Sequence, residues 1–97
     1  MTHKWTKDDD IVTYYLYRYG NESTIPLLHD IKIISEILGM SESSLRMRIG
    51  NFQAIDGAGG LDHFGLLSKK VYDEYKSIPR EYHLKKVEEI LENKSRK

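Results

Sequence analysis

Apolar residues recur at helical spacing through two adjacent segments, 30–38 and 41–55. In the first segment they are Ile31, Ile34, Ile37 and Leu38, and in the second Leu45, Ile49 and Phe52. Each set lies on one side of a helix, so both segments are predicted to be helices with one buried face. Between them, Gly39 predicts a left-handed helix stop, because it has no Cβ to clash at positive φ. Ser41 then predicts the N-cap of the second helix.

Two short helices joined by a glycine-containing turn are typical of a helix-turn-helix. The second helix keeps a polar set out of the predicted core: Glu42, Ser43, Arg46, Met47 and Gly50, with Arg48 and Asn51 on the flanks. Hydroxyls near the N-terminus followed by arginines suit a helix that enters the major groove of DNA. The same set also suits the solvated face of an ordinary helical hairpin, and the spacing alone leaves both interpretations open.

An earlier helix is predicted after Thr6, a good N-cap, and ends at Gly20-Asn21. Its inward stripe is Ile11, Val12, Tyr15, Leu16 and Tyr19, which leaves Tyr14 and Tyr17 outside the stripe. Three carboxylates, at residues 8–10, crowd its first turn. They fan around the helix instead of converging, so capping is favoured over metal binding. In the loop 21–29, Ile25, Leu27 and Leu28 are expected to pack under the hairpin.

The C-terminal third predicts two more helices. Leu61–Leu67 is expected to return apolar side chains to the core, and a helix is predicted from about Ser68, with Val71, Tyr72, Tyr75 and Ile78 inward. Pro79 opens a last helix that runs to about Asn93, before a basic, frayed tail, Lys94–Lys97. Its apolar stripe is Leu84, Val87, Ile90 and Leu91. That stripe either closes the chain's own core or pairs two subunits into a homodimer.

The expected architecture is therefore all-α, a small bundle of about five helices containing a helix-turn-helix. Residues 1–97 are predicted to form one domain, with a core module at 5–78 and a C-terminal helix and basic tail at 79–97. The 97 residues contain no cysteine, which excludes disulfides and thiolate metal sites. No apolar run approaches the length of a membrane span, so a cytoplasmic protein is expected. The formal net charge of zero is unusual for a DNA-binding protein.

No catalytic or cofactor motif is recognisable. The four histidines, His3, His29, His63 and His83, lie far apart, in no metal-binding spacing, and are expected at the surface or in loops. No serine sits in a nucleophile elbow. The glycine-rich segment 56–60 is not followed by Lys-Ser/Thr, so it is a turn and not a phosphate loop. The sequence thus predicts a protein that is not an enzyme and needs no metal or cofactor.

Several short motifs resemble one known module. They are Trp5-Thr6, Ile37-Leu38-Gly39, the run from Ser43-Ser44 to Asn51-Phe52, Ile55-Asp56 and Gly60-Leu61. Together they are similar to the N-terminal helical domain that precedes the nuclease domain in some bacterial HNH endonucleases, several of them restriction-like. The similarity spans Trp5 to about Tyr75. It implies that Ser43, Ser44, Arg46, Arg48 and Asn51 help engage DNA. Nothing after Ile78 matches the His-Asn-His nuclease, so cleavage is not implied.

Two functions remain. The first is a stand-alone module for double-stranded DNA, either a small regulator or the recognition component of a restriction-type system. Its candidate contacts are Ser43, Ser44, Arg46, Met47, Arg48, Asn51, Lys69 and Lys70. The second is a protein-interaction factor, such as a phage-encoded inhibitor of a bacterial defence system. A basic patch at the four cationic residues of the set favours the first function, and an acidic or apolar patch favours the second.

Overall fold

The computed structural model describes residues 4–20, 30–56 and 66–95. Five helices account for most of these residues: α1 (Lys7–Tyr19), α2 (Ile31–Leu38), α3 (Glu42–Ile55), α4 (Leu66–Tyr75) and α5 (Arg80–Ser95). The described ranges contain no strand, so the predicted all-α bundle of about five helices is confirmed. None of these helices has the length and apolar character needed to cross a membrane.

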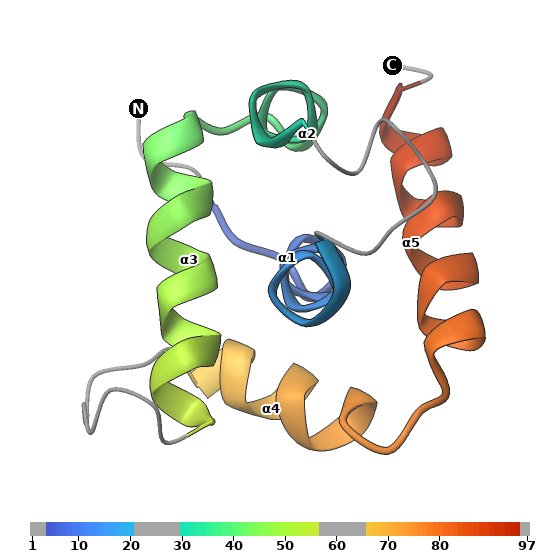
Figure 1. Cartoon of the computed structure of the whole chain (residues 1–97). Coiled ribbons are helices and arrows are strands. Elements are labelled where there is room, and N and C mark those ends of the chain that lie inside the picture. The colour runs from blue at the N-terminus through green and yellow to red at the C-terminus, as the bar shows by residue number, and fades with distance from the viewer. Residues whose placement is uncertain (1–3, 21–29, 57–65, 96–97) are drawn as a thin grey trace.

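Helix α1 occupies the centre of the molecule. Figure 1 shows it end-on, with α2, α3, α4 and α5 arranged around it. All eight residues of the segment 9–16 are buried, so α1 is enclosed on all sides and does not bury only one stripe. The position predicted for Tyr14 was therefore wrong. Its side chain is 3% exposed, and its ring stacks on Phe52 with 4.9 Å between the ring centroids.

The start of α1 follows local capping rules. Thr6 Oγ1 accepts a hydrogen bond from the Asp9 amide at 3.3 Å, and Asp9 Oδ2 accepts one from the Thr6 amide at 3.0 Å. This reciprocal capping box satisfies two amides that the helix leaves without internal partners. The predicted capping role is confirmed for Asp9, while Asp10 is used in another way, described below.

The turn between α2 and α3 forms as predicted. Gly39 has φ +82°, and its amide donates to the Glu36 carbonyl oxygen at 3.1 Å. Ser41 caps α3, since its side-chain oxygen accepts from the Ser44 amide at 3.1 Å. Figure 1 shows α2 along its axis and α3 from the side, so the two helices run in different directions across this short turn.

Helix α5 is part of the core and not an appendage to it. Val87, Ile90 and Leu91 are buried within the chain, and Leu84 packs beside them. Of the two uses predicted for this stripe, closing the chain's own core is the one observed, and the homodimer through α5 stays a prediction. The core cluster contains residues from both sides of position 78.

The basic tail is shorter than predicted. Helix α5 extends to Ser95, and Lys94 Nζ lies 3.2 Å from Asp9 Oδ1 at the start of α1. Lys94 is therefore fixed by an ion pair and not frayed. The last two residues, 96 and 97, lie outside the described part of the chain.

Helix α4 begins at Leu66, two residues before the predicted start. Leu66 is 86% exposed and so does not return to the core, whereas Ser68, Val71 and Tyr75 do. The rest of that predicted apolar segment, 61–65, lies outside the described residues. So do Ile25, Leu27 and Leu28, together with His3, His29 and His63.

The described histidine, His83, was predicted at the surface or in a loop but is fully buried in the aromatic core. Its ring packs against Tyr14, Tyr15 and Tyr75, at centroid distances of 5.6, 5.1 and 4.9 Å. Nε2 lies 2.9 Å from the carbonyl oxygen of Ile11, which assigns the ring proton to Nε2. Nδ1 has no hydrogen-bond partner among the described residues. Burial lowers the pKa of His83 from 6.5 to about 4.

Replacing Leu45 by alanine should lower the free energy of unfolding by about 2–5 kcal/mol, because the fully buried side chain leaves a cavity. Met47→Ala is the matched control on the same helix, since Met47 is 76% exposed; its effect should stay within about 0.5 kcal/mol. Urea denaturation measures both. Equal effects of the two substitutions would contradict the observed orientation of α3.

Acidification should destabilise the fold through His83. Its folded-state pKa is lowered, so between about pH 6.5 and 4 the unfolded chain binds a proton that the folded chain does not. Stability from the neutral ring is complete above this window and falls by up to about 3 kcal/mol across it. Urea titrations at several pH values should show a smaller decline for His83→Gln, which cannot titrate. An identical decline in both proteins would contradict this role.

Candidate functional site

Helix α3 has one side in the core and one side open. Leu45 and Phe52 are fully buried, while Ser43, Arg46 and Met47 are exposed. Figure 1 shows α3 at the rim of the molecule, with α1, α2 and α4 all on its inner side. This arrangement follows from the sequence pattern, since the apolar stripe can be buried only by turning the polar set outward.

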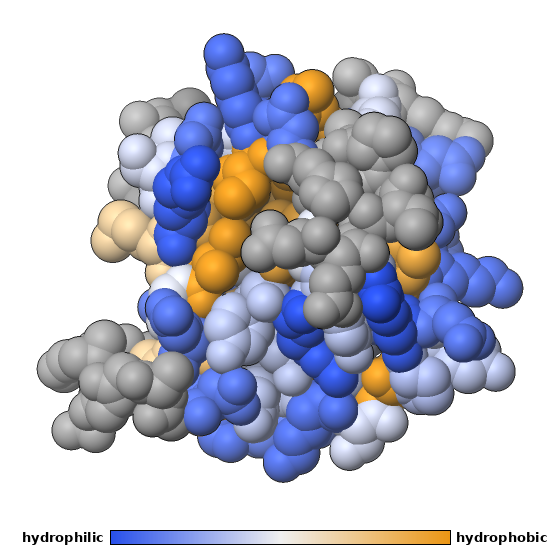
Figure 2. All heavy atoms as spheres, in the orientation of Figure 1, coloured by the Kyte–Doolittle hydropathy of each residue, from blue (hydrophilic) through white to orange (hydrophobic). Residues whose placement is uncertain are grey.

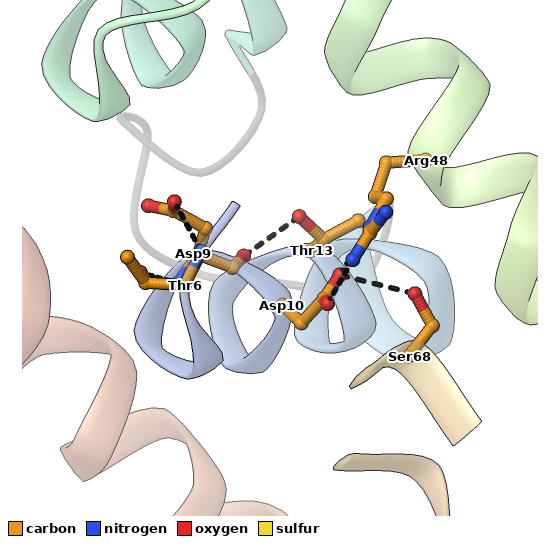
Figure 3. A network of polar contacts seen from close by, with 6 residues as sticks. All are labelled: Thr6, Asp9, Asp10, Thr13, Arg48 and Ser68. Atoms are coloured by element: carbon orange, nitrogen blue, oxygen red, sulfur yellow. Dashed lines mark hydrogen bonds and ion pairs between the residues drawn. The ribbon is translucent and has the colours of Figure 1, made fainter. Parts of the chain in front are cut away.

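Arg48 holds α3 against the centre of the molecule. Its Nε and Nη2 atoms donate to the two carboxylate oxygens of Asp10, at 2.8 and 2.6 Å (Figure 3). Ser68 Oγ donates to the same carboxylate at 3.3 Å, so one acidic group joins α1, α3 and α4. The Asp10 side chain is fully buried and that of Arg48 is 14% exposed. Arg48, predicted as a DNA contact, thus has a structural role inside the domain.

Trp5 forms the outer wall beside this ion pair. The guanidinium carbon of Arg48 lies 4.3 Å from the centroid of the Trp5 ring, a cation–π contact. Because the Asp10 carboxylate fixes the guanidinium in a two-pronged geometry, it also fixes the surface against which the indole stacks. The position of Trp5 next to α3 therefore depends on a residue of α1.

An open pocket of about 220 Å³ lies between Trp5 and α3. It is lined by Trp5, Ser44, Met47, Arg48 and Asn51. The Ser44 hydroxyl accepts a hydrogen bond from Ser41 at 2.9 Å, whereas the Asn51 amide makes no hydrogen bond to a described residue. Enclosed ligand sites usually exceed about 300 Å³. This smaller pocket suits a protruding group of a larger partner better than a whole small molecule.

The remaining predicted cations lie outside the pocket, and two of them have carboxylate partners. Arg46 Nη2 lies 3.0 Å from Glu42, and Lys69 Nζ lies 2.8 Å from Asp73. These pairs are exposed, and such pairs contribute only about 0.3–0.5 kcal/mol, so a phosphate group can displace the carboxylate. Lys70 is exposed on α4.

The C-terminal end of α3 is joined to its neighbours by a second polar contact. Asp56 accepts hydrogen bonds from Tyr17 at 2.9 Å and from Tyr72 at 3.1 Å. The hydrogen bond to Asp56 is the main cause that raises the pKa of Tyr72. For Tyr17, burial is the larger cause that raises the pKa, and the hydrogen bond to Asp56 adds to it. Both hydroxyls thus stay protonated, and the contact links α1 and α4 to the end of α3.

The pocket brings together some of the residues that the sequence predicted as DNA contacts, but the residues that hold it in place were not predicted. Four predicted residues, Ser44, Met47, Arg48 and Asn51, line the pocket together. Trp5 was named only as part of the resemblance and not as a site residue, and Asp10 was taken only as part of an acidic first turn. No pattern of neighbouring residues predicts the contact between Asp10 and Arg48, because the two residues are 38 positions apart.

In the described part of the chain, no group of three or more histidine, aspartate and glutamate side chains is placed to hold a metal ion. Comparisons with protein-family models, curated proteins and solved structures gave no significant match.

Replacing Arg48 by methionine should lower the free energy of unfolding by about 3–5 kcal/mol, because Asp10 is then buried without a counter-charge. Arg46→Met removes the same charge from the same helix and should cost less than about 1 kcal/mol, since its ion pair is exposed. Adding Asp10→Asn to Arg48→Met should recover part of the loss. Chemical denaturation gives all three values. Equal costs for the two single substitutions would contradict the structural role of Arg48.

Proposed function

We propose that this chain is a DNA-binding module in which α2 and α3 act as a helix-turn-helix and α3 enters the major groove of double-stranded DNA. The observation that carries the proposal is the position of α3, anchored along its inner side and open along its outer side. Its 14 residues make a rod about 21 Å long. The major groove, about 12 Å wide, admits such a helix.

The side chains on the open face suit a polar, anionic partner. Ser43 is exposed near the start of α3, and hydroxyls are common phosphate contacts. Arg46 is exposed one turn later, and its contact with Glu42 costs little to break. Lys69 and Lys70 on the neighbouring helix add further cationic groups. Arg48 is assigned a positioning role in this proposal, because two of its N–H groups bind the buried Asp10 carboxylate and its side chain is only 14% exposed.

The biological setting is inferred from the resemblance to the helical domains of HNH endonucleases. Those domains accompany nucleases, several of them restriction-like, so we infer a small regulator or a recognition component of a restriction or defence-type system. The proposal includes no catalytic step, metal or cofactor for this chain, and it places the protein in the cytoplasm together with its DNA.

A protein partner is the second candidate, favoured by a different set of observations. Met47 is 76% exposed on the same face of α3. Figure 2 shows an apolar strip beside α3, and exposed apolar surface often marks a protein-binding site. The pairing of Arg46 and Lys69 with carboxylates also reduces the local positive potential. In this candidate the module is an interaction factor, for instance an inhibitor of a defence system.

The salt dependence of binding separates the two candidates. Removing Arg46 and Lys70 together, as a double alanine variant, should weaken binding to all duplexes. It should also flatten the slope of log affinity against log salt by up to about 1.8 units, because each lost phosphate contact accounts for about 0.9. Fluorescence anisotropy with labelled duplex DNA at several salt concentrations gives this slope.

The matched control is Lys85→Ala/Lys86→Ala, which removes two positive charges from α5, on the other side of α1 from α3. It should leave the slope close to that of the unmodified protein. The same flattening in both variants would show that the effect is one of net charge and not of the α3 face. Failure of the unmodified protein to bind duplex DNA at low salt would reject the DNA proposal and favour the protein partner.

A further inference from the structure

The residues of α3 that line the pocket lie along one side of that helix. Ser44, Met47 and Asn51 stand at positions i, i+3 and i+7, so their side chains project in nearly the same direction. Trp5 borders them on one side, and Arg48 lies against the Trp5 ring. A partner that approaches the open face of α3 therefore meets these three side chains in a row.

Two of the five lining residues keep their binding groups available. Arg48 is committed to Asp10, and the Ser44 hydroxyl is bonded to the N-cap Ser41. The Asn51 amide is not bonded to any described residue, and the Met47 thioether is exposed. The pocket thus offers one amide, which has both donor and acceptor atoms, next to one soft apolar group.

We propose that Asn51 and Met47 read an A·T base pair, an inference that rests on the proposed DNA function. In the major groove an adenine presents the N7 acceptor and the N6 amino donor, and its thymine presents a 5-methyl group. The Asn51 amide nitrogen donates to N7 and its oxygen accepts from N6. The Met47 side chain packs against the thymine methyl. A G·C pair has no methyl group and presents an acceptor, O6, where adenine has its amino donor.

The rigid surroundings of Asn51 make this assignment selective. The Asp10–Arg48 ion pair fixes the register of α3 against α1, and the tyrosine contacts of Asp56 fix its far end. A fixed helix cannot move to present another side chain to a mismatched base pair. Discrimination therefore falls on the two free side chains, while Ser43, Arg46 and Lys70 supply contacts that do not depend on sequence.

The test begins with selection of bound sequences from a random duplex library by the unmodified protein, at low salt. The selected site should contain an A·T pair at a constant position. Two duplexes then each change one group of that pair: deoxyuridine in place of thymidine removes only the methyl, and 7-deazaadenine in place of adenine removes only N7. Affinities are measured by fluorescence anisotropy, and Trp5 fluorescence reports binding beside α3.

For the unmodified protein, loss of the methyl should weaken binding about three- to fivefold, the usual worth of one buried methyl group. Loss of N7 should weaken it about fivefold or more, as expected for part of a bidentate contact. Met47→Ala should be insensitive to the methyl, and Asn51→Ala should be insensitive to N7. Gln53→Ala is the matched control, because it removes an exposed amide from another side of α3 and should behave as the unmodified protein.

The outcomes separate this inference from the proposed function. The comparison uses four duplexes: the selected A·T site, its deoxyuridine form, its 7-deazaadenine form and a form with G·C at that position. If the protein binds all four with the same affinity, the base-reading role is wrong and the DNA function stands. If Gln53→Ala abolishes the discrimination and Asn51→Ala preserves it, the reading face is also assigned wrongly. If no duplex binds even at low salt, both the inference and the DNA function are rejected.

Discussion

The buried ion pair between Asp10 and Arg48 is the interaction on which the arrangement of helices depends. A carboxylate enclosed on every side is strongly unfavourable unless a counter-charge and hydrogen bonds compensate it. Here the guanidinium of α3 and the hydroxyl of Ser68 supply both, so α1, α3 and α4 meet at one group. The Trp5 ring packs against the same guanidinium. The surface beside α3 therefore depends on the buried carboxylate of Asp10.

Features set by a few neighbouring residues were predictable from the sequence. The stop at Gly39, the cap at Ser41 and the box between Thr6 and Asp9 each require chemistry within three or four positions. The side of α3 that faces outward follows from its apolar stripe in the same way. For this reason Met47, Arg48 and Asn51 were expected on or beside the outward side of α3, and they line one pocket together with Ser44.

Features set by distant partners were not predictable. Tyr14 and His83 carry polar atoms and interrupt the apolar pattern, so nothing local marks them as core residues. The burial of His83 is completed by a carbonyl group 72 positions earlier in the chain. Arg48 looked like its neighbour Arg46, and only the fold distinguishes an arginine buried against a carboxylate from one in solvent. Central helix α1 was misread for the same reason, since its polar residues suggested an exposed side.

The central claim is that the open face of α3 binds duplex DNA, and an NMR titration of the ¹⁵N-labelled protein tests it most directly. Added duplex should shift the Trp5 indole resonance and the backbone amides from Ser43 to Asn51, while the amides of α5 between Lys85 and Ser95 stay in place. Shifts confined to α5, or no shifts with DNA at low salt, would contradict the claim.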